Sequence, residues 1–403
     1  MPEPVRFYSP WRVAALGLLA LLVLVPVTLP VAVLRGLVQE RFGVSEALTS
    51  LFMSINMVGA VLAAPLAGAL ADRFGRRPQG IVAALLADAA CFLALTQPMP
   101  FSLFLGIRFL EGCAHIFALS QLLALASGCR PAEQRGRVMG LVGGGLLLGV
   151  AVGAPLGGQV GRVDPVAPLY LGSAISLAAA LLAAMILRET DAGGERRPGL
   201  AAIARLVRGN ALLAVPLAFA FIDRFTVGFY TTTFSLFLQR IHDLPPPRIG
   251  VLIAIFMLPF AALSVPFGIL AERTSRALLL CGGSLLYGIG TASLPWCPVD
   301  ALPWLMAATG SAAAVMFVPS LVMTTELTPG AVRSTALGAF NAAGSLGFIL
   351  GPVAGGLVSQ EVARQAGSWE TGYRAAFLVA GGSEILLALS VLPLLLIWER
   401  RRR

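Results

Sequence analysis

Lysine is absent from this 403-residue chain, and all 29 basic residues are arginines. Without lysine there is no Schiff-base chemistry and no lysine-dependent phosphate loop, and each of these 29 cations is permanently charged. Only two histidines occur, His115 and His242, and neither an HExxH nor a GxSxG pattern is present. The five cysteines show no CxxC pairing, which indicates neither a disulfide framework nor a metal site. These absences disfavour a membrane enzyme.

Charged residues are also scarce, at 12% of the chain against 57% hydrophobic residues. A chain of this composition cannot bury its apolar surface by folding into ordinary soluble domains, so a lipid bilayer is its expected solvent. Apolar stretches of about 18 residues or more indicate membrane-spanning helices. We count twelve, at residues 13–34, 46–70, 79–96, 101–127, 138–160, 167–187, 211–238, 249–271, 277–295, 301–324, 335–358 and 375–397.

The arginines are distributed unevenly between the connections. If the N-terminus is cytoplasmic, the inner loops and tails hold 20 arginines, the outer side holds seven and the spans hold two. Positive charge gathers on the inner side of membrane proteins, so we expect a multi-pass protein of the cell (inner or plasma) membrane with both termini cytoplasmic. The same distribution explains the net charge of +9 without a nucleic-acid partner. The first span lacks an obvious cleavage site and is expected to be a retained helix.

The second half of the chain repeats the first. Eight residues of the first half recur 198 residues later, and GALADR at 68–73 has a counterpart, GILAER, at 268–273. Six spans fall in each half, and a charged segment containing Gly and Pro separates the halves. We therefore predict an all-α membrane protein of two pseudo-symmetric six-helix bundles, 1–188 and 210–403, joined by a cytoplasmic linker at 189–209.

The connection after the second span has the sequence GALADRFGRR, residues 68–77. With the six-plus-six spans and the weaker second copy, it resembles the signature of the major facilitator superfamily, and the resemblance covers the whole chain. The resemblance implies the twelve-helix fold of that family and a conformational latch in this loop, although the arginines alone would also serve to fix topology. The matching residues are Gly68, Asp72, Arg73, Gly75, Arg76 and Arg77, with Gly268, Glu272 and Arg273 in the second copy.

Span four carries RFLEG, residues 108–112, which resembles a further motif of the family with Glu111 where glutamine is commoner. Spacings of three and four place Arg108, Glu111 and His115 on one helical face. An intramembrane charge costs roughly 2.5 to 3.5 kcal/mol on insertion scales, so this face is expected to line a polar cavity or to pair internally. Glu111 is a candidate proton carrier; the alternative is a static salt bridge that only positions the helix.

Span seven contains two adjacent charges, Asp223 and Arg224. Neighbouring residues diverge by about 100° around a helix, so at least one is expected to find its counter-charge on another helix. Arg108 for Asp223 and Glu111 for Arg224 are the natural partners. Substrate binding or proton coupling is the preferred role, and a static pair between the halves is the alternative.

Other polar and aromatic residues in the spans extend this set. Tyr230 and Asn341 are added as candidate substrate-binding or coupling residues. Asp88 and Glu384 lie in spans that are peripheral in the family, so a local, hydrogen-bonded role is expected for both. Phenylalanines and methionines in several spans offer an adaptable apolar lining for a lipophilic substrate.

Glycines recur every four residues in span five, and such a stripe allows a neighbouring helix to approach closely. The stripe is similar to the antiporter motif of the family, which occurs mainly in exporters, although Ala154 stands where the family has Gly before Pro. The residues are Gly145, Gly149, Gly153, Pro155, Gly157 and Gly158, and the closer Gly-Pro match in span eleven comprises Gly351, Pro352, Gly355 and Gly356.

These patterns predict a secondary transporter, resembling the twelve-helix drug:proton antiporters, that exports a small lipophilic or amphipathic molecule by alternating access. We expect a monomer with no cofactor, whose partners are the substrate, protons and the bilayer, and whose energy source is the proton gradient. One alternative is a transporter of organic anions or a specific metabolite, in either direction, that uses Arg108 and Arg224. A non-transporting membrane receptor or scaffold is the alternative from another class.

Overall fold

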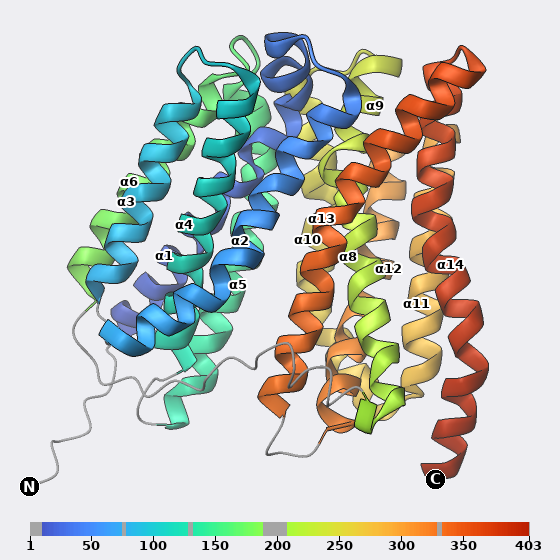
Figure 1. The fold of residues 1–403 in the computed structure, drawn as a ribbon. Coiled ribbons are helices and arrows are strands. Elements are labelled where there is room, and N and C mark those ends of the chain that lie inside the picture. Colours follow the sequence, from blue (N-terminus) through green and yellow to red (C-terminus); the bar gives the residue numbers. More distant parts are fainter. Residues whose placement is uncertain (1–9, 75–77, 128–131, 188–207, 329–332, 403) are drawn as a thin grey trace, which may run out of the picture. The chain divides into compact units, whose positions relative to one another are not determined.

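The computed structural model describes residues 10–74, 78–127, 132–187, 208–328 and 333–402 (Figure 1). Within these ranges the side chains are described except at 65–74, 78, 124, 127, 132–137, 265, 268, 271–273, 333–334 and 401–402. Everything described is helix or connection, without a strand. The all-helical class predicted from the sequence is therefore confirmed.

Eleven of the described helical stretches are long and apolar enough to cross a membrane, and Gln79–Leu95 is a shorter apolar helix. Together they fall on the twelve predicted spans. The helices are α1 (Pro10–Thr28), α2 (Glu46–Phe74), α3 (Pro78–Leu95), α4 (Phe101–Ser127), α5 (Ala132–Val160), α6 (Ala167–Ile186), α8 (Ala214–Thr231), α9 (Thr233–Ile241), α10 (Pro246–Arg273), α11 (Arg276–Ser293), α12 (Leu302–Glu326), α13 (Arg333–Ala366) and α14 (Trp369–Arg402).

Three spans are not single α-helices, and in the ninth a 3₁₀ helix, η4 (Leu294–Trp296), follows α11. The first continues from α1 into a 3₁₀ helix, η1 (Leu29–Val33), and a π-helix, η2 (Arg35–Glu40), follows. The seventh is interrupted at Thr232, where α8 gives way to α9. The hydroxyls of Thr231 and Thr232 both donate to the carbonyl oxygen of Gly228, at 2.9 and 3.0 Å. Side-chain hydroxyls that bond to a helix carbonyl compete with the backbone hydrogen bonds, and two of them meet at this break.

The chain forms two compact units. One comprises Met1–Val33 with Ile55–Arg196, and the other comprises Leu34–Ser54 with Arg197–Arg403. The outer end of α2 therefore packs with the second unit, where the Ser54 hydroxyl donates to the carbonyl oxygen of Ile349 at 2.7 Å. The bundle boundaries proposed from the sequence, 188 and 210, stay a prediction.

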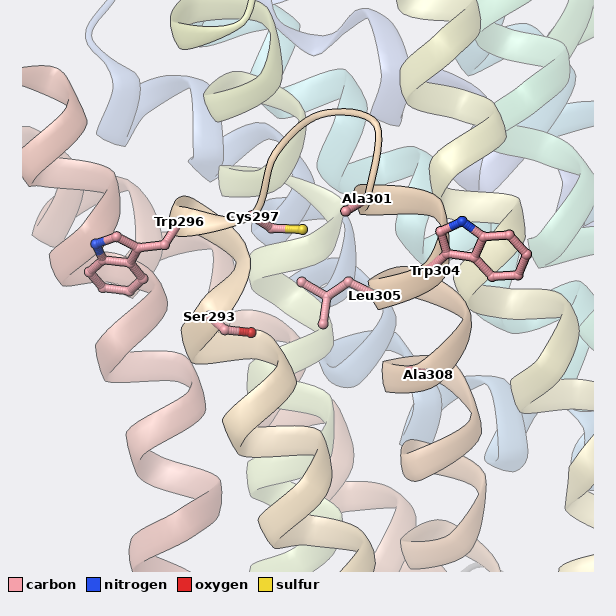
Figure 2. A pocket seen from close by; sticks show the side chains of 7 residues that line it. All are labelled: Ser293, Trp296, Cys297, Ala301, Trp304, Leu305 and Ala308. Carbon is pink, nitrogen blue, oxygen red and sulfur yellow. The ribbon is translucent and has the colours of Figure 1, made fainter.

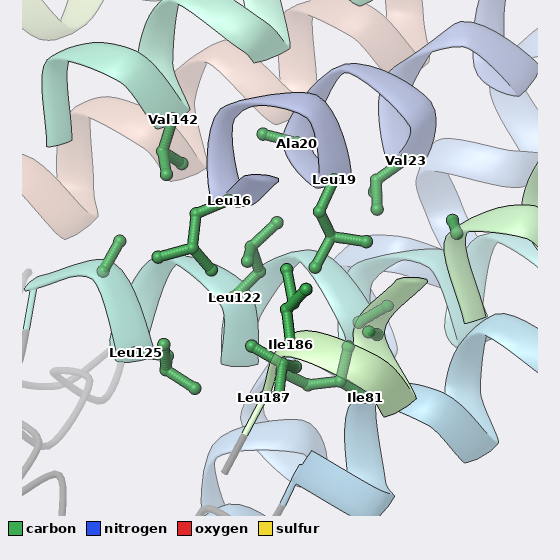
Figure 3. Close-up of a cluster of buried hydrophobic side chains, with 14 of the residues drawn as sticks. Leu16, Leu19, Ala20, Val23, Ile81, Leu122, Leu125, Val142, Ile186 and Leu187 are labelled. Carbon is green, nitrogen blue, oxygen red and sulfur yellow. The ribbon is translucent and has the colours of Figure 1, made fainter. Parts of the chain in front are cut away.

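An apolar core holds the first unit together. In this unit α1 packs on α5 and α6, while α3 packs on α4 and α6. Figure 3 shows Leu16 and Leu19 of α1 directed toward Leu122 of α4 and Ile186 of α6. In the second unit α8 packs on α13, and α11 lies beside α12 and α14 (Figure 1).

The glycine stripe of α5 lies directly on the backbone of α1. A methyl group added at Gly149 would lie 2.6 Å from the Leu21 carbonyl oxygen. The three other glycines of the stripe meet carbonyls in the same way, one turn apart. The second unit repeats the arrangement, with Gly347 and Gly351 of α13 on carbonyls of α8. The glycine–carbonyl pairs are Gly145–Gly17, Gly149–Leu21, Gly153–Val25 and Gly157–Leu29 in the first unit, and Gly347–Phe221 and Gly351–Phe225 in the second.

Candidate functional site

The first unit buries a cluster of acids and bases between α3 and α4. A carboxylate oxygen of Asp88, a carboxylate oxygen of Glu111 and a ring nitrogen of His115 all lie within 4.8 Å of one another. Their exposed fractions are 1%, 0% and 8%. Arg108, which is also fully buried, lies one turn before Glu111 on α4. The common helical face predicted for Arg108, Glu111 and His115 is present, and it points into the protein.

An ion pair and two hydrogen bonds fix the two carboxylates. Glu111 Oε2 forms the ion pair with Arg108 Nη1 at 2.8 Å, and it accepts a hydrogen bond from the Asn56 side-chain amide on α2. Asp88 Oδ2 accepts from the Ser176 hydroxyl on α6 at 2.6 Å. The Arg108 guanidinium lies 5.7 Å from the ring centre of Phe92. The internal salt bridge considered for Arg108 and Glu111 is therefore present, but it is one part of a larger cluster.

Sequence reasoning gave Asp88 a local hydrogen-bonded role and missed its approach to Glu111. The hydrogen bond to Ser176 agrees with that role, but the same side chain also reaches the α4 cluster. A signal was available, because α3 and α4 are consecutive helices joined by a short connection near residue 98. Residues at similar distances from such a turn reach similar depths, and Asp88 and Arg108 are equally far from it.

The two carboxyl groups of this cluster outnumber its permanent positive charge. At 4.8 Å and an effective dielectric constant of about 20, two like unit charges repel by about 3.5 kcal/mol. Arg108 supplies one permanent positive charge against two carboxyl groups. With both acids ionised and His115 neutral, a buried excess negative charge would remain, and one bound proton removes it.

The charged pair of α8 in the second unit differs from the expectation. Arg224 Nη1 bonds to Asp223 Oδ2, so the two adjacent residues pair with each other. The expectation that at least one of them needs a counter-charge on another helix is therefore wrong. The guanidinium is long enough to fold back across the 100° between the two positions, and it lies 4.7 Å from the ring centre of Phe317. The Arg224 side chain remains 22% exposed, whereas that of Asp223 is 2% exposed.

Two other predicted residues of the second unit lie in contrasting surroundings. Tyr230 is buried in an aromatic stack, 4.6 Å from the Phe256 ring centre, and its hydroxyl is 3.0 Å from that of Thr291. Its ring and hydroxyl are both buried in this arrangement, and its role in substrate binding stays a prediction. Asn341 is exposed on α13, one turn before Gly344, where a methyl group would lie 3.1 Å from Arg224 Cγ.

Two more buried acids belong to the second unit. Glu384 of α14 accepts from the Ser284 hydroxyl of α11 at 2.5 Å, as expected for a local role. The other, Glu46, was missed. Its side chain is fully buried at the start of α2, with Arg240 Nη2 at 3.1 Å and the Ser359 hydroxyl at 3.5 Å. The sequence signal was weak, because Glu46 lies at a predicted span boundary where an acid is ordinarily solvated.

A groove of about 530 Å³ opens at the end of α11 and α12 (Figure 2). Trp296 and Trp304 flank it and are 51% and 80% exposed. Tryptophans at the ends of spanning helices are typical of the membrane interface. None of the predicted site residues lines this groove, which is formed by Ser293, Trp296, Cys297, Ala301, Trp304, Leu305 and Ala308.

The latch remains a prediction. Gly75, Arg76 and Arg77 lie outside the described residues, and the side chains at Gly68, Asp72, Arg73, Gly268, Glu272 and Arg273 are not among those described. In the antiporter-like motif, Gly158 and Pro352 are buried and Pro155 is partly buried. Gly355 and Gly356 meet side chains of Thr233 and Ser50, respectively.

Comparison with known proteins places the whole chain in one family. The sequence profile of the Major Facilitator Superfamily matches residues 13–230 and 217–403. Multidrug resistance protein 2 of Bacillus subtilis is 26% identical over 313 residues, which cover 75% of this chain and 77% of that protein. The class C tetracycline resistance protein of Escherichia coli is 30% identical over 163 residues, 40% of this chain and 38% of its own length.

The fold agrees with the sequence comparison. A crystal structure of a bacterial homologue of the human lysosomal transporter Spinster superposes with a TM-score of 0.83 at 16% identity, covering 96% of this chain and 97% of that one. The twelve spans, the profile match and this likeness agree. The chain belongs to the Major Facilitator Superfamily and is a multi-pass membrane transporter of small molecules.

Proposed function

We propose that this chain is a proton-coupled exporter of small lipophilic or amphipathic molecules that works by alternating access. The observation that carries the proposal is the buried cluster of Asp88, Glu111, His115 and Arg108. Ionisable groups inside membrane-spanning helices are costly, and pairs of acids that hold one proton are a means of coupling transport to a proton gradient. Glu111 belongs to this cluster, and Asp223 is the corresponding buried acid of the second unit.

Export rests on the relatives and on the glycine motif. Two proteins similar to this chain are named for resistance to multiple drugs and to tetracycline. The stripe on α5 and its counterpart on α13 resemble the motif of exporters in this family. We further propose a monomer in the inner membrane, with both termini cytoplasmic and no cofactor.

The second unit offers contacts for an amphipathic substrate. Arg224 is partly exposed, with the rings of Phe317 and Phe348 at 4.7 and 5.7 Å from its guanidinium. The exposed amide of Asn341 lies one turn from the helix position that meets Arg224. Aromatic faces beside a polar tip suit a molecule with an apolar body and one polar group.

A second candidate function is transport of organic anions. Arg224 favours it, since this permanently charged side chain retains exposed surface beside its partner Asp223. An anionic substrate would compete with Asp223 for the guanidinium. A lipophilic cation would gain nothing from that side chain, so the two candidates are separated by the charge of the molecule that is transported.

Transport into inverted membrane vesicles tests both candidates. Vesicles with an acidic interior are supplied with ethidium, tetracycline or the anion fluorescein, and vesicles without the protein serve as the baseline. We expect ethidium or tetracycline to accumulate, and a protonophore to abolish the accumulation. Uptake that persists without the pH gradient would contradict proton coupling. Accumulation of fluorescein alone would replace the first candidate by the second.

A further inference from the structure

The two carboxyl groups of the first unit each have one oxygen without a hydrogen-bond partner among the described residues. These atoms are Asp88 Oδ1 and Glu111 Oε1, and both are buried. The ion pair and the hydrogen bonds described above all go to the other oxygen of each group. A buried carboxylate oxygen without a donor is costly, and a proton placed between two such oxygens satisfies both.

The donors differ between the two acids. Glu111 receives a guanidinium, Arg108, and a side-chain amide, Asn56, and neither group can accept a hydrogen bond through its nitrogen. Asp88 receives only the hydroxyl of Ser176, which is neutral. A nearby positive charge stabilises the ionised form of the acid that it contacts. The negative charge therefore belongs on Glu111 and the proton belongs on Asp88.

The charges around Asp88 and Glu111 are balanced by one bound proton, and a cation of higher charge would exceed the balance. The titratable groups that face Asp88 are Arg108, Glu111 and His115 from α4 and Cys91 from α3, and Cys113 of α4 lies beside Cys91. From α6, the hydroxyl of Ser176 contacts Asp88. With neutral thiols and imidazole, one proton together with Arg108 balances the two carboxyl groups. A divalent cation would leave an excess positive charge in the apolar interior, which opposes its binding.

We propose that Asp88 is the proton-carrying residue of the first unit: the proton lies on Asp88 Oδ1, is shared with Glu111 Oε1, and leaves Glu111 ionised against Arg108. On release the O–H bond of Asp88 breaks, the proton passes to water and the electron pair stays on the carboxylate. Glu111 then acts as a positioning residue. The location of the proton is argued from the unpartnered oxygens and from the different partners of the two acids, and its movement during transport rests on the proposed function.

Infrared spectroscopy of the purified protein locates the proton without any transport. At neutral pH we expect a carbonyl stretch of a protonated carboxylic acid in the difference spectrum between wild type and Asp88→Asn. Carbon-13 at the carboxyl carbon of aspartate should shift this band, and the same label in glutamate should not. A difference spectrum without the band, or a band that shifts with labelled glutamate, would overturn the assignment.

Two further variants control this measurement. In Glu111→Gln the carboxyl of Asp88 becomes the counter-ion of Arg108, so the aspartic acid band should disappear there too, which gives a second test if Asp88→Asn does not fold. Persistence of the band in Glu111→Gln would contradict the shared proton. Asp300→Asn replaces an acid whose side chain is 99% exposed and should leave the band unchanged.

Vesicle transport then decides whether this proton moves. We expect Asp88→Asn to let ethidium or tetracycline equilibrate across the membrane while the pH gradient no longer drives accumulation, and Asp300→Asn to accumulate the same compound as wild type does. Accumulation by Asp88→Asn that still follows the gradient would refute the carrier role. If wild type itself ignores the gradient, the proposed function fails, while the infrared result still decides where the proton resides.

Discussion

Arg224 forms an ion pair with Asp223, the residue that immediately precedes it on α8. The pair is asymmetric, because Asp223 is almost completely buried while the guanidinium keeps some exposed surface and two aromatic neighbours. The two partners therefore depend on each other to different degrees. The buried carboxylate of Asp223 relies on Arg224 for its counter-charge. The Arg224 guanidinium keeps solvent-exposed surface and contacts with the rings of Phe317 and Phe348.

Substitutions of this pair should have unequal effects on stability. Arg224→Ala leaves a buried carboxylate without its cation, which costs about 1–3 kcal/mol, whereas Asp223→Asn keeps an isosteric polar group. We expect the larger fall in melting temperature of the detergent-purified protein for Arg224→Ala. The double variant should recover part of the loss, because it removes the uncompensated charge. Equal falls for the two single variants would contradict this account.

The glycine stripe predicts a position-specific effect along α5. Gly149→Ala places a methyl group 2.6 Å from the Leu21 carbonyl oxygen, so α1 and α5 must separate. Overpacking of this kind costs about 1–3 kcal/mol. Gly143→Ala and Gly144→Ala are matched controls on the same helix, because a methyl group there meets nothing within 4 Å. Thermal unfolding should separate Gly149→Ala from both controls, and similar melting temperatures for all three would argue against close contact.

The ion pair between Arg240 and Glu46 should be sensitive to the shape of the cation. The guanidinium carbon of Arg240 lies 3.9 Å from the Trp369 ring centre, while Nη2 lies 3.1 Å from Glu46 Oε2. Arg240→Lys keeps the charge and loses the planar stacking, so a loss of about 1 kcal/mol or less is expected. Arg240→Ala also strands Glu46 and should cost about 1–3 kcal/mol. Unfolding in detergent should reproduce this order, and a lysine variant as unstable as the alanine variant would count against it.

Cys297 provides a test of orientation and of local burial. It lies between α11 and α12, on the outer side if both termini are cytoplasmic, and burial raises the pKa of its thiol. The raised pKa lowers the thiolate fraction at neutral pH, so reaction with a membrane-impermeant maleimide should accelerate at higher pH than it does for glutathione. The experiment uses intact cells and a variant in which the other four cysteines are alanine. Labelling that occurs only after permeabilisation would reverse the proposed orientation.

The positions of the spans were predictable from the sequence, because the bilayer requires a similar length and an apolar composition of every span. Even the span at 277–295, rich in glycine and serine, corresponds to α11. The helix break at Thr232, where two hydroxyls bond to the Gly228 carbonyl, was not predicted. Hydropathy measures how apolar a segment is and contains no information on its hydrogen bonds.

The candidate site was predictable only along single helices. Spacing on α4 placed Arg108, Glu111 and His115 together, because side chains three and four apart share a face. Asp88 joins them through packing between helices, which spacing on one helix does not contain. Helical spacing did not predict the pairing of Arg224 with Asp223. Adjacent Cα–Cβ bonds diverge on a helix, but the long, flexible arginine side chain can still reach its neighbour.

The contact between α1 and α5 is periodic on both sides, with a glycine and a carbonyl every four residues. Sliding one helix by four residues, about 6 Å, would recreate three of the four contacts, so the stripe alone does not define the register. The register therefore needs a contact that does not repeat along the helix. Thr28 provides one, since its hydroxyl donates to the Val150 carbonyl oxygen at 3.2 Å. The stripe thus sets how closely the two helices pack, and a single threonine sets their alignment along the axis.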